Sequence, residues 1–269
     1  MAPPPKRRLS AESEPFPADP LQHAMASRDK DIMSLVRNAL ASGSARLAFQ
    51  PIVLAKQPRQ IAFYEGLVRV LDDGGRILPA ALFMPLVEEM DLGREIDCTT
   101  MRLGLEMLRV NPALRLSLNV SARSVGDGAW RRILDEGLAR SPHIGERLIL
   151  EISESSAMLL HEVMIRFMAE MQPRGVSFAL DGFGAGMTAF RHLKDFFFDI
   201  AKVDRCFVRD IDTSPDNQVL AQALITVAHQ FDMFTVAEGV ETQEEAAVLR
   251  QLGIGCLQGY LFGVPKFSL

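Results

Sequence analysis

Short apolar runs alternate along this chain with longer amphipathic stretches, and seven of the runs end on a polar side chain. The runs and their last residues are IAFYE (Glu65), LRLSLN (Asn119), RLILE (Glu151), VSFALD (Asp181), FDIAK (Lys202), FTVAE (Glu238) and GCLQ (Gln258). Alternation of strands with helix-like stretches is typical of a parallel sheet. In a parallel α/β barrel, the C-terminal ends of the strands converge on one mouth. We therefore expect the seven side chains to meet there.

The first two predicted strands differ from the rest. They cover residues 47–52 and 61–69, and the eight residues between them are too few for a helical crossover. We therefore expect this pair to be antiparallel. Apolar periodicity then predicts helices near residues 80–90, 93–110, 124–140, 157–172, 187–195, 216–231 and 242–252. Together these elements indicate a TIM-like (β/α)₈ barrel whose first strand runs antiparallel to the others.

The N-terminal region has a different composition. Residues 1–26 are rich in proline and charge, which predicts a disordered tail. Residues 27–45 carry an apolar stripe at Ile32, Leu35, Val36 and Leu40, which predicts a helix and linker packed outside the main domain. The barrel domain then occupies residues 46–269.

Composition narrows the class of protein. A chain of 269 residues suits one barrel. Its net charge of −5 disfavours binding to a nucleic-acid polymer. The three cysteines form no paired motif and indicate reduced thiols. No apolar stretch reaches the roughly 18 residues of a membrane helix. We expect a cytoplasmic protein without membrane insertion.

The side chains at the strand ends suggest a metal site. Glu65, Asn119, Glu151 and Asp181 offer oxygen ligands, which suit Mg²⁺, Mn²⁺ or Ca²⁺ better than zinc or copper. Gathered carboxylates are costly unless cations neutralise them. None of the five histidines ends a strand, so we expect no histidine-based metal site. Taken singly, each residue has a simpler role, such as a helix cap, an Asx turn at Asn119 or a snorkelling Lys202. The coincidence across seven strands favours a shared site.

From about Phe49 to Pro265 the chain resembles the EAL family, the metal-dependent phosphodiesterases and binding proteins of cyclic di-GMP. The signature appears as Glu65-Gly66-Leu67 followed by Arg69, with glycine for the usual alanine. The supporting motifs, in order, are FQPI at 49–52, NVS at 119–121, LEISE at 150–154, KVDR at 202–205, AEGVET at 237–242 and QGY at 258–260. Each motif is weak alone, but this order and spacing are very specific.

The resemblance implies a role for each of these residues. Glu65, Asn119, Glu151 and Asp181 would hold a first metal, and Asp181 with Glu238 a second. The cofactor would be Mg²⁺ or Mn²⁺, with Ca²⁺ a possible but inhibitory occupant. Lys202 would hold or activate the attacking water, with Glu238 and Glu154 also in the catalytic set. Glu154 would steady the loop after Asp181. The residues that would bind the nucleotide are Arg69, as a phosphate clamp, with Gln50, Leu67, Asp204, Glu241 and Gln258.

One departure from the family bears on activity. Active members carry a second aspartate after Asp181, and this chain has Gly182; the following loop also departs at Ala185, Met187 and Ala189. Losing even an outer partner of a metal typically costs about 10–100-fold in affinity or activity. We therefore expect a cyclic di-GMP effector with weak or absent hydrolysis. An active phosphodiesterase that releases linear pGpG is the alternative, because most catalytic residues remain. A nucleotide-independent scaffold is less favoured, because it gives no reason for so many polar residues at the mouth.

The resemblance also implies a homodimer, because EAL domains commonly pair through the region after Asp181. The apolar side chains there are Phe183, Met187, Phe190, Phe196, Phe197 and Phe198. Barrel core is the alternative role for these residues. No motif identifies a protein signalling partner.

Overall fold

The computed structural model describes residues 20–72, 74–87, 90–186 and 190–269. It begins with helix α1, Pro20–Ala41, which starts earlier than the predicted boundary after residue 26. Proline is well suited to a first helical position, because its fixed φ is already helical and its missing N–H has no partner to lose there. Residues 20–26 are therefore helical, and the rest of the predicted tail lies outside the described residues.

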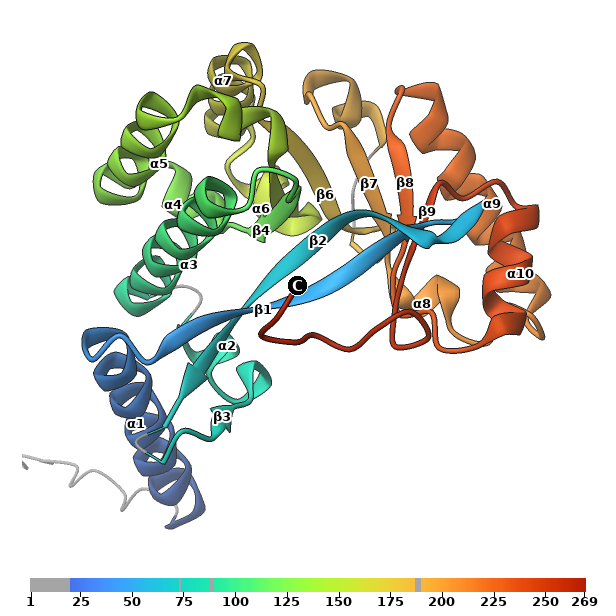
Figure 1. Cartoon of the computed structure of the whole chain (residues 1–269). Helices are drawn as coiled ribbons and strands as arrows, with labels where there is room; N and C mark the ends of the chain where they lie inside the picture. The colour runs from blue at the N-terminus through green and yellow to red at the C-terminus, as the bar shows by residue number, and fades with distance from the viewer. Residues whose placement is uncertain (1–19, 73, 88–89, 187–189) are drawn as a thin grey trace, which may run out of the picture.

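Eight strands close into a barrel. They are β1 (Ala45–Leu54), β2 (Gln57–Leu71), β4 (Leu116–Asn119), β5 (Leu148–Ser153), β6 (Ser177–Phe183), β7 (Ile200–Val203), β8 (Phe234–Ala237) and β9 (Cys256–Gln258). Neighbours from β2 round to β9 pair in parallel, whereas β1 is antiparallel to both β2 and β9. The predicted barrel and its antiparallel first strand are thus confirmed. Figure 1 shows the long β1–β2 hairpin crossing the front of the molecule.

The helical elements flank the barrel (Figure 1). The α-helices after α1 are α2 (Ala80–Val87), α3 (Asp91–Val110), α4 (Ala122–Val125), α5 (Gly128–Arg140), α6 (Glu154–Leu159), α7 (His161–Met171), α8 (Arg205–Val208), α9 (Pro215–Gln230) and α10 (Gln243–Gln251). The 3₁₀ turns are η1 (Pro142–Arg147), η2 (Gln172–Arg174) and η3 (Phe190–Asp195), and β3 (Ile77–Leu78) pairs with the outer end of β2.

Two predicted helices are broken in the structure. The predicted helix 124–140 splits because the Asp127 side chain caps a new helix, accepting the backbone N–H groups of Ala129 and Trp130 at 2.9 Å. The predicted helix 157–172 is divided between α6 and α7 at Leu160. The predicted helix 187–195 is described from residue 190 onward, where it is the 3₁₀ turn η3.

An apolar layer fills the barrel below the mouth. It consists of Ile52, Phe63, Ile149, Ala179, Ile200, Val236 and Cys256. Alternate residues of a strand share a face. Two residues further toward the mouth along the same strands stand Gln50, Glu65, Glu151, Asp181, Lys202, Glu238 and Gln258. The packed interior layer therefore fixes which side chains point into the mouth.

Helix α1 packs on the outside of the barrel. Val36 and Ala39 on α1 lie in one buried cluster with Val70 of β2, Phe83 of α2 and Ile96 of α3. This cluster joins the outer end of the β1–β2 hairpin to α1, α2 and α3. Residues of α2 and α3 also line the cavity at the mouth.

The phenylalanines proposed for dimerisation are mostly core residues. Phe183, Phe196 and Phe198 are buried in the main hydrophobic cluster, so they cannot present a dimer surface. Phe197 is the exception, with 44% of its surface exposed. Met187 and the side chain of Phe190 lie outside the described residues. In the part of the chain that the structure describes, no helix has the length and apolarity needed to cross a membrane.

Candidate ligand and metal site at the barrel mouth

The ammonium group of Lys202 is the centre of the mouth. Its Nζ lies 2.6 Å from Glu151 Oε2, 2.8 Å from Glu238 Oε1, 3.3 Å from Glu65 Oε2 and 3.6 Å from Asp181 Oδ1. The Lys202 side chain is only 1% exposed. Four carboxylates among the predicted site residues, contributed by β2, β5, β6 and the end of β8, thus meet around the Lys202 nitrogen of β7.

The charges in this cluster do not balance. Burial lowers the pKa of Lys202, but the surrounding carboxylates, Glu151 foremost, raise it well above its ordinary value, so the amine is charged. Burial raises the pKa of Glu151 to about 8, assisted by repulsion from Glu65. Burial likewise raises the pKa of Glu238 to about 7. With these raised pKa values the two carboxyls hold protons near neutral pH, and a bound cation would displace those protons.

Three side chains of the cluster donate hydrogen bonds to Glu65. It accepts from Asn119 Nδ2 at 2.7 Å and from Gln258 Nε2 at 2.5 Å. Burial alone would raise its pKa, but Lys202, Gln258 and Asn119 lower it below the ordinary value. Gln258 also donates to Gln50 Oε1 at 3.2 Å. The mouth therefore holds Glu65 as an ionised carboxylate in a fixed orientation.

The residues present fit a divalent cation with oxygen ligands. Oε1 of Glu151 and Oε1 of Gln258 are buried, and neither has a hydrogen-bond partner among the described residues. An unpartnered buried oxygen is destabilising unless a cation or water binds it. With Asn119 and the neighbouring carboxylates, this donor set is one that Mg²⁺ or Mn²⁺ prefers. The carboxylates here turn toward Lys202 rather than toward one another.

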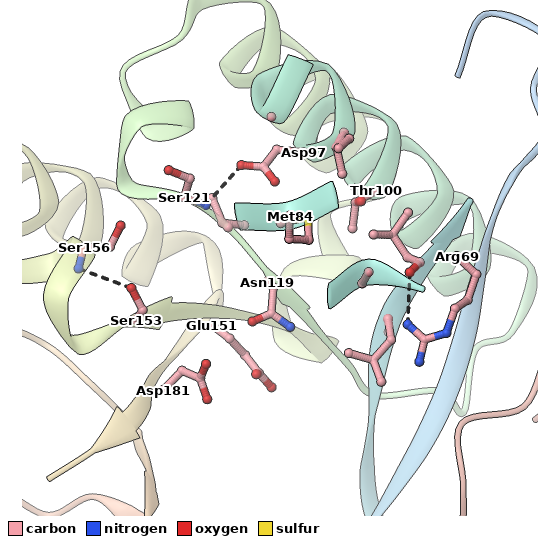
Figure 2. Close-up of a pocket in the computed structure, with 17 residues that line it drawn as sticks. Arg69, Met84, Asp97, Thr100, Asn119, Ser121, Glu151, Ser153, Ser156 and Asp181 are labelled. Atoms are coloured by element: carbon pink, nitrogen blue, oxygen red, sulfur yellow. Dashed lines mark hydrogen bonds between the residues drawn. The ribbon is translucent and has the colours of Figure 1, made fainter. Parts of the chain in front are cut away.

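Arg69 lies in a cavity on one half of the mouth (Figure 2). Residues alternating along β2 share a face, so Glu65, Leu67 and Arg69 all project to the mouth side. The Arg69 guanidinium donates to the carbonyl of Val68 at 3.0 Å, and partial burial lowers its pKa. Asn119, Glu151 and Asp181 line the same cavity. Three of the four predicted cation ligands and a guanidinium thus face one space of about 290 Å³.

A second cavity occupies the other half of the mouth. Its volume is about 670 Å³, and its lining residues are Gln50, Glu65, Leu67, Asp204, Arg205, Cys206, Arg209, Glu238, Gly239, Glu241, Glu245, Gln258, Gly259 and Tyr260. Leu67 borders both cavities. Sites for small ligands commonly measure about 300–1,000 Å³. The mouth therefore has space for a small ligand that extends over both cavities.

The loop after Asp181 is tied to helix α6, which follows the neighbouring strand β5. The backbone N–H of Gly184 donates to Glu154 Oε2 at 2.9 Å, and Glu154 is buried at the start of α6. Gly182 has a φ of +69°, and a Cβ built there would have one neighbour within 4 Å, Asp204 Oδ2 at 3.9 Å. The position has space for a side chain, which would point toward Asp204. Its left-handed backbone favours glycine and tolerates asparagine or aspartate better than most residues.

Packing against β4 gives a reason for the glycine within the signature. A Cβ on Gly66 would lie 2.8 Å from Leu118 Cδ2 and 3.2 Å from Leu116 Cδ1. Alanine at this position would therefore require the buried side chain of Leu118 to shift.

Two residues at the mouth were not among the predicted site residues. Asp97 of α3 accepts the backbone N–H of Ser121 at 3.1 Å and the hydroxyl of Ser124 at 2.6 Å, which braces the segment after Asn119. Tyr260 is 66% exposed and lines the second cavity. No pattern marks Asp97, whereas Tyr260 was visible in the Gln258-Gly259-Tyr260 motif.

The sequence model of the EAL domain family matches residues 34–265 of this chain. The chain belongs to the EAL domain family. It is 31% identical over 241 residues to the probable cyclic di-GMP phosphodiesterase PdeA of Escherichia coli K12, covering 87% of this chain and 32% of that protein. It is 29% identical over 245 residues to the cyclic di-GMP phosphodiesterase NbdA of Pseudomonas aeruginosa, covering 89% of this chain and 31% of that protein. The EAL domain thus spans about a third of the length of these curated relatives.

Solved structures have the same fold. The EAL domain of FimX from Pseudomonas aeruginosa, bound to c-di-GMP, matches with a TM-score of 0.80 at 26% identity, covering 88% of this chain and 97% of that one. The phosphodiesterase PaMucR in complex with c-di-GMP matches with a TM-score of 0.77 at 26% identity and the same coverage.

Proposed function

We propose that this EAL domain binds cyclic di-GMP as a signalling effector and hydrolyses it weakly or not at all. The observation that carries the proposal is the combination of a complete oxygen-ligand set at the mouth with glycine at position 182. The relatives are named as cyclic di-GMP phosphodiesterases, and the structural neighbours hold c-di-GMP.

The two cavities support the choice of ligand. Cyclic di-GMP has two phosphodiester groups and two guanine bases, and an extended conformer would place one half on either side of Leu67. Arg69 would pair with one phosphate, because a guanidinium matches phosphate oxygens in a bidentate geometry. Arg205 and Arg209 line the other cavity, where Tyr260 offers an exposed ring on which a base can stack.

The metal ligands would be divided between two positions. Glu65, Asn119, Glu151 and Asp181 would hold one Mg²⁺ or Mn²⁺, and Asp181 with Glu238 would hold a second. Bound metal ions would neutralise the phosphate and activate water for hydrolysis. Lys202 would orient that water through its ammonium group. Gln50, Gln258, Asp204 and Glu241 would line the nucleotide, and Glu154 would keep the loop after Asp181 in place.

Gly182 is the reason to favour an effector. Aspartate at this position would add a carboxylate beside Asp181, whereas glycine adds no side-chain ligand. We infer that the second metal position is weakened, while binding through the first position and Arg69 is retained. The alternative, an active phosphodiesterase that releases linear pGpG, is favoured by the retention of Lys202 and Glu238. In that case Glu154, Glu241 or water would replace the missing ligand.

One assay tests both functions. The chain is incubated with cyclic di-GMP and Mg²⁺ or Mn²⁺, and binding is measured by calorimetry while linear product is measured by chromatography. Binding with little product supports the effector. Turnover at about 1 per second or more, an ordinary enzymatic rate, would establish the phosphodiesterase instead. Absence of binding with and without metal would refute both readings and leave a nucleotide-independent scaffold.

A further inference from the structure

A second group of metal-ligating side chains lies away from the mouth. His161 is the first residue of α7, and His192 and Asp195 belong to η3. His161 Nε2 is 3.5 Å from Asp195 Oδ2, and His192 Nδ1 is 3.8 Å from the same oxygen. None of the three residues lines either cavity of the mouth. Among the described residues, this is the one group of His, Cys, Asp and Glu whose ligand atoms all lie within 4.8 Å of one another.

The environment of His161 points to an absent ligand. Its Nε2 is buried and has no hydrogen-bond partner among the described residues, and 3.5 Å to Asp195 is too long for a strong bond. The ring is held by edge-on contacts with His192, at 5.4 Å between centroids, and with Phe196, at 4.8 Å. A buried imidazole nitrogen held toward a carboxylate and a second imidazole is ready to coordinate an ion.

We propose that His161, His192 and Asp195 form a binding site for a transition-metal ion, with Zn²⁺ as the best fit. Zinc bonds to nitrogen and oxygen measure about 2.0–2.2 Å, so tetrahedral geometry separates ligand atoms by about 3.3–3.6 Å. The separations of 3.5 and 3.8 Å from Asp195 are close to these values, and the ligand atoms of the two histidines lie within 4.8 Å of each other. Three protein ligands leave the fourth position to water.

Ligand chemistry separates this site from the mouth. Two imidazoles and a carboxylate favour Zn²⁺, Co²⁺, Ni²⁺ or Cu²⁺, whereas the oxygen donors around Lys202 favour Mg²⁺ or Mn²⁺. No histidine ends a strand, which is why the sequence predicts no histidine-based metal site, whereas these two histidines stand at a helix start and in a 3₁₀ turn. The proposed zinc site does not depend on the proposed function.

The bound ion would join two segments that both lead from the mouth. His161 follows β5 and α6, which carry Glu151 and Glu154, and η3 follows β6, which carries Asp181 and Gly182. Glu154 already links these segments through the N–H of Gly184. A metal at His161 and Asp195 would add a second link between them.

The test is a zinc titration of the full chain after removal of metal by a chelator, with Mg²⁺ in excess. We expect one Zn²⁺ per chain by calorimetry, and a visible absorption spectrum of tetrahedral type when Co²⁺ replaces it. The variants His161→Ala, His192→Ala and Asp195→Asn should each weaken zinc binding by at least about 10–100-fold. Zinc should raise the melting temperature of the unaltered chain and leave that of the variants unchanged, with their metal-free melting temperatures as reference.

Three matched variants serve as controls. His229→Ala removes an exposed histidine on α9, Cys206→Ser removes an exposed thiol, and Glu151→Gln alters the mouth. All three should keep the zinc affinity of the unaltered chain. The proposal is overturned if no zinc binds at micromolar concentration, if the cluster variants bind it normally, or if Cys206→Ser is the variant that loses it.

Discussion

Nζ of Lys202 lies 2.6 Å from Oε2 of Glu151, and both side chains are enclosed at the centre of the barrel mouth. A buried ion pair adds little net stability when intact, but removing one partner strands the other charge away from water. Since four carboxylates approach this ammonium, its loss would remove the positive charge that lies nearest to all four.

Replacing Lys202 should therefore be strongly destabilising. We expect Lys202→Met to lower the free energy of unfolding of the metal-free chain by about 3–5 kcal/mol, measured by urea denaturation. Mn²⁺ should restore part of this loss, because a divalent cation supplies the missing positive charge. Lys194→Met, at an exposed position of η3, is the matched control and should leave stability nearly unchanged. Equal stability of the two variants would contradict this account of the mouth.

A second prediction concerns the metal. The pKa of Glu65 is lowered, so this proposed ligand is ionised. Glu65→Gln retains its shape but removes its charge, so Mn²⁺ affinity should fall by at least about 10–100-fold. Titration followed by electron paramagnetic resonance of free Mn²⁺ measures the change. Glu106→Gln, exposed on α3, should have no effect. Unchanged affinity in Glu65→Gln would show that the ligand assignment is wrong.

Strand-end residues were predictable because two periodic constraints act on them together. Glu151 and Lys202 each stand two residues after a buried residue, so they share its face of the strand. The C-terminal ends of parallel barrel strands all lie at one mouth, so the sequence predicts that the two side chains converge there. The contact between the Lys202 ammonium and the Glu151 carboxylate does not follow from sequence, because it depends on the stagger of β5 against β7. The break at Asp127 depends on a local side-chain cap, which outweighed the apolar periodicity of residues 124–140.

Contacts between distant irregular segments were not predictable. His161 and His192 are in contact because η3 folds against the start of α7. The spacing of apolar residues in the two segments does not predict this contact. The phenylalanines near η3 show the same limit. Phe196, Phe197 and Phe198 are equally apolar, yet the backbone turns the middle one outward.

The nucleotide-binding prediction centres on Arg69. Arg69→Ala should weaken cyclic di-GMP binding at least tenfold, about 1.4 kcal/mol, because a charge-assisted bidentate contact to phosphate is lost. Arg69→Lys should recover only part of it, since an ammonium cannot donate in a planar fork. Calorimetry gives the dissociation constants. Arg115→Ala is the control, because this exposed residue precedes β4 at the end of the barrel opposite Asn119. Equal losses in Arg69→Ala and Arg115→Ala would indicate a general charge effect.

Dimerisation is a separate prediction that now rests on one side chain. If the chain pairs through the region after Asp181, exposed Phe197 is the described phenylalanine available for contact. Phe197→Ser should then shift the chain toward monomer in sedimentation velocity at micromolar concentration. Phe234→Ser is the control, because Phe234 is 73% exposed at the start of β8. If the unaltered chain sediments only as a monomer, with and without cyclic di-GMP, the dimer prediction is refuted.

Gly182 decides between effector and enzyme. If the missing carboxylate is the main defect, Gly182→Asp should raise the rate of cyclic di-GMP hydrolysis in Mn²⁺, and each tenfold gain corresponds to about 1.4 kcal/mol of transition-state stabilisation. The position has room, since the nearest atom to a new Cβ is Asp204 Oδ2 at 3.9 Å.

Two effects oppose this rescue, and a matched variant separates them from the gain. The φ of +69° strains any side chain, and Asp204 repels a second carboxylate. Gly182→Asn carries nearly the same shape and backbone strain without the charge. We expect hydrolysis to increase in Gly182→Asp and not in Gly182→Asn, with both variants binding the nucleotide. An equal rate in all three chains would mean that the defect lies elsewhere in the loop. A high rate in the unaltered chain would mean that Gly182 is no defect, because another ligand then completes the second metal position.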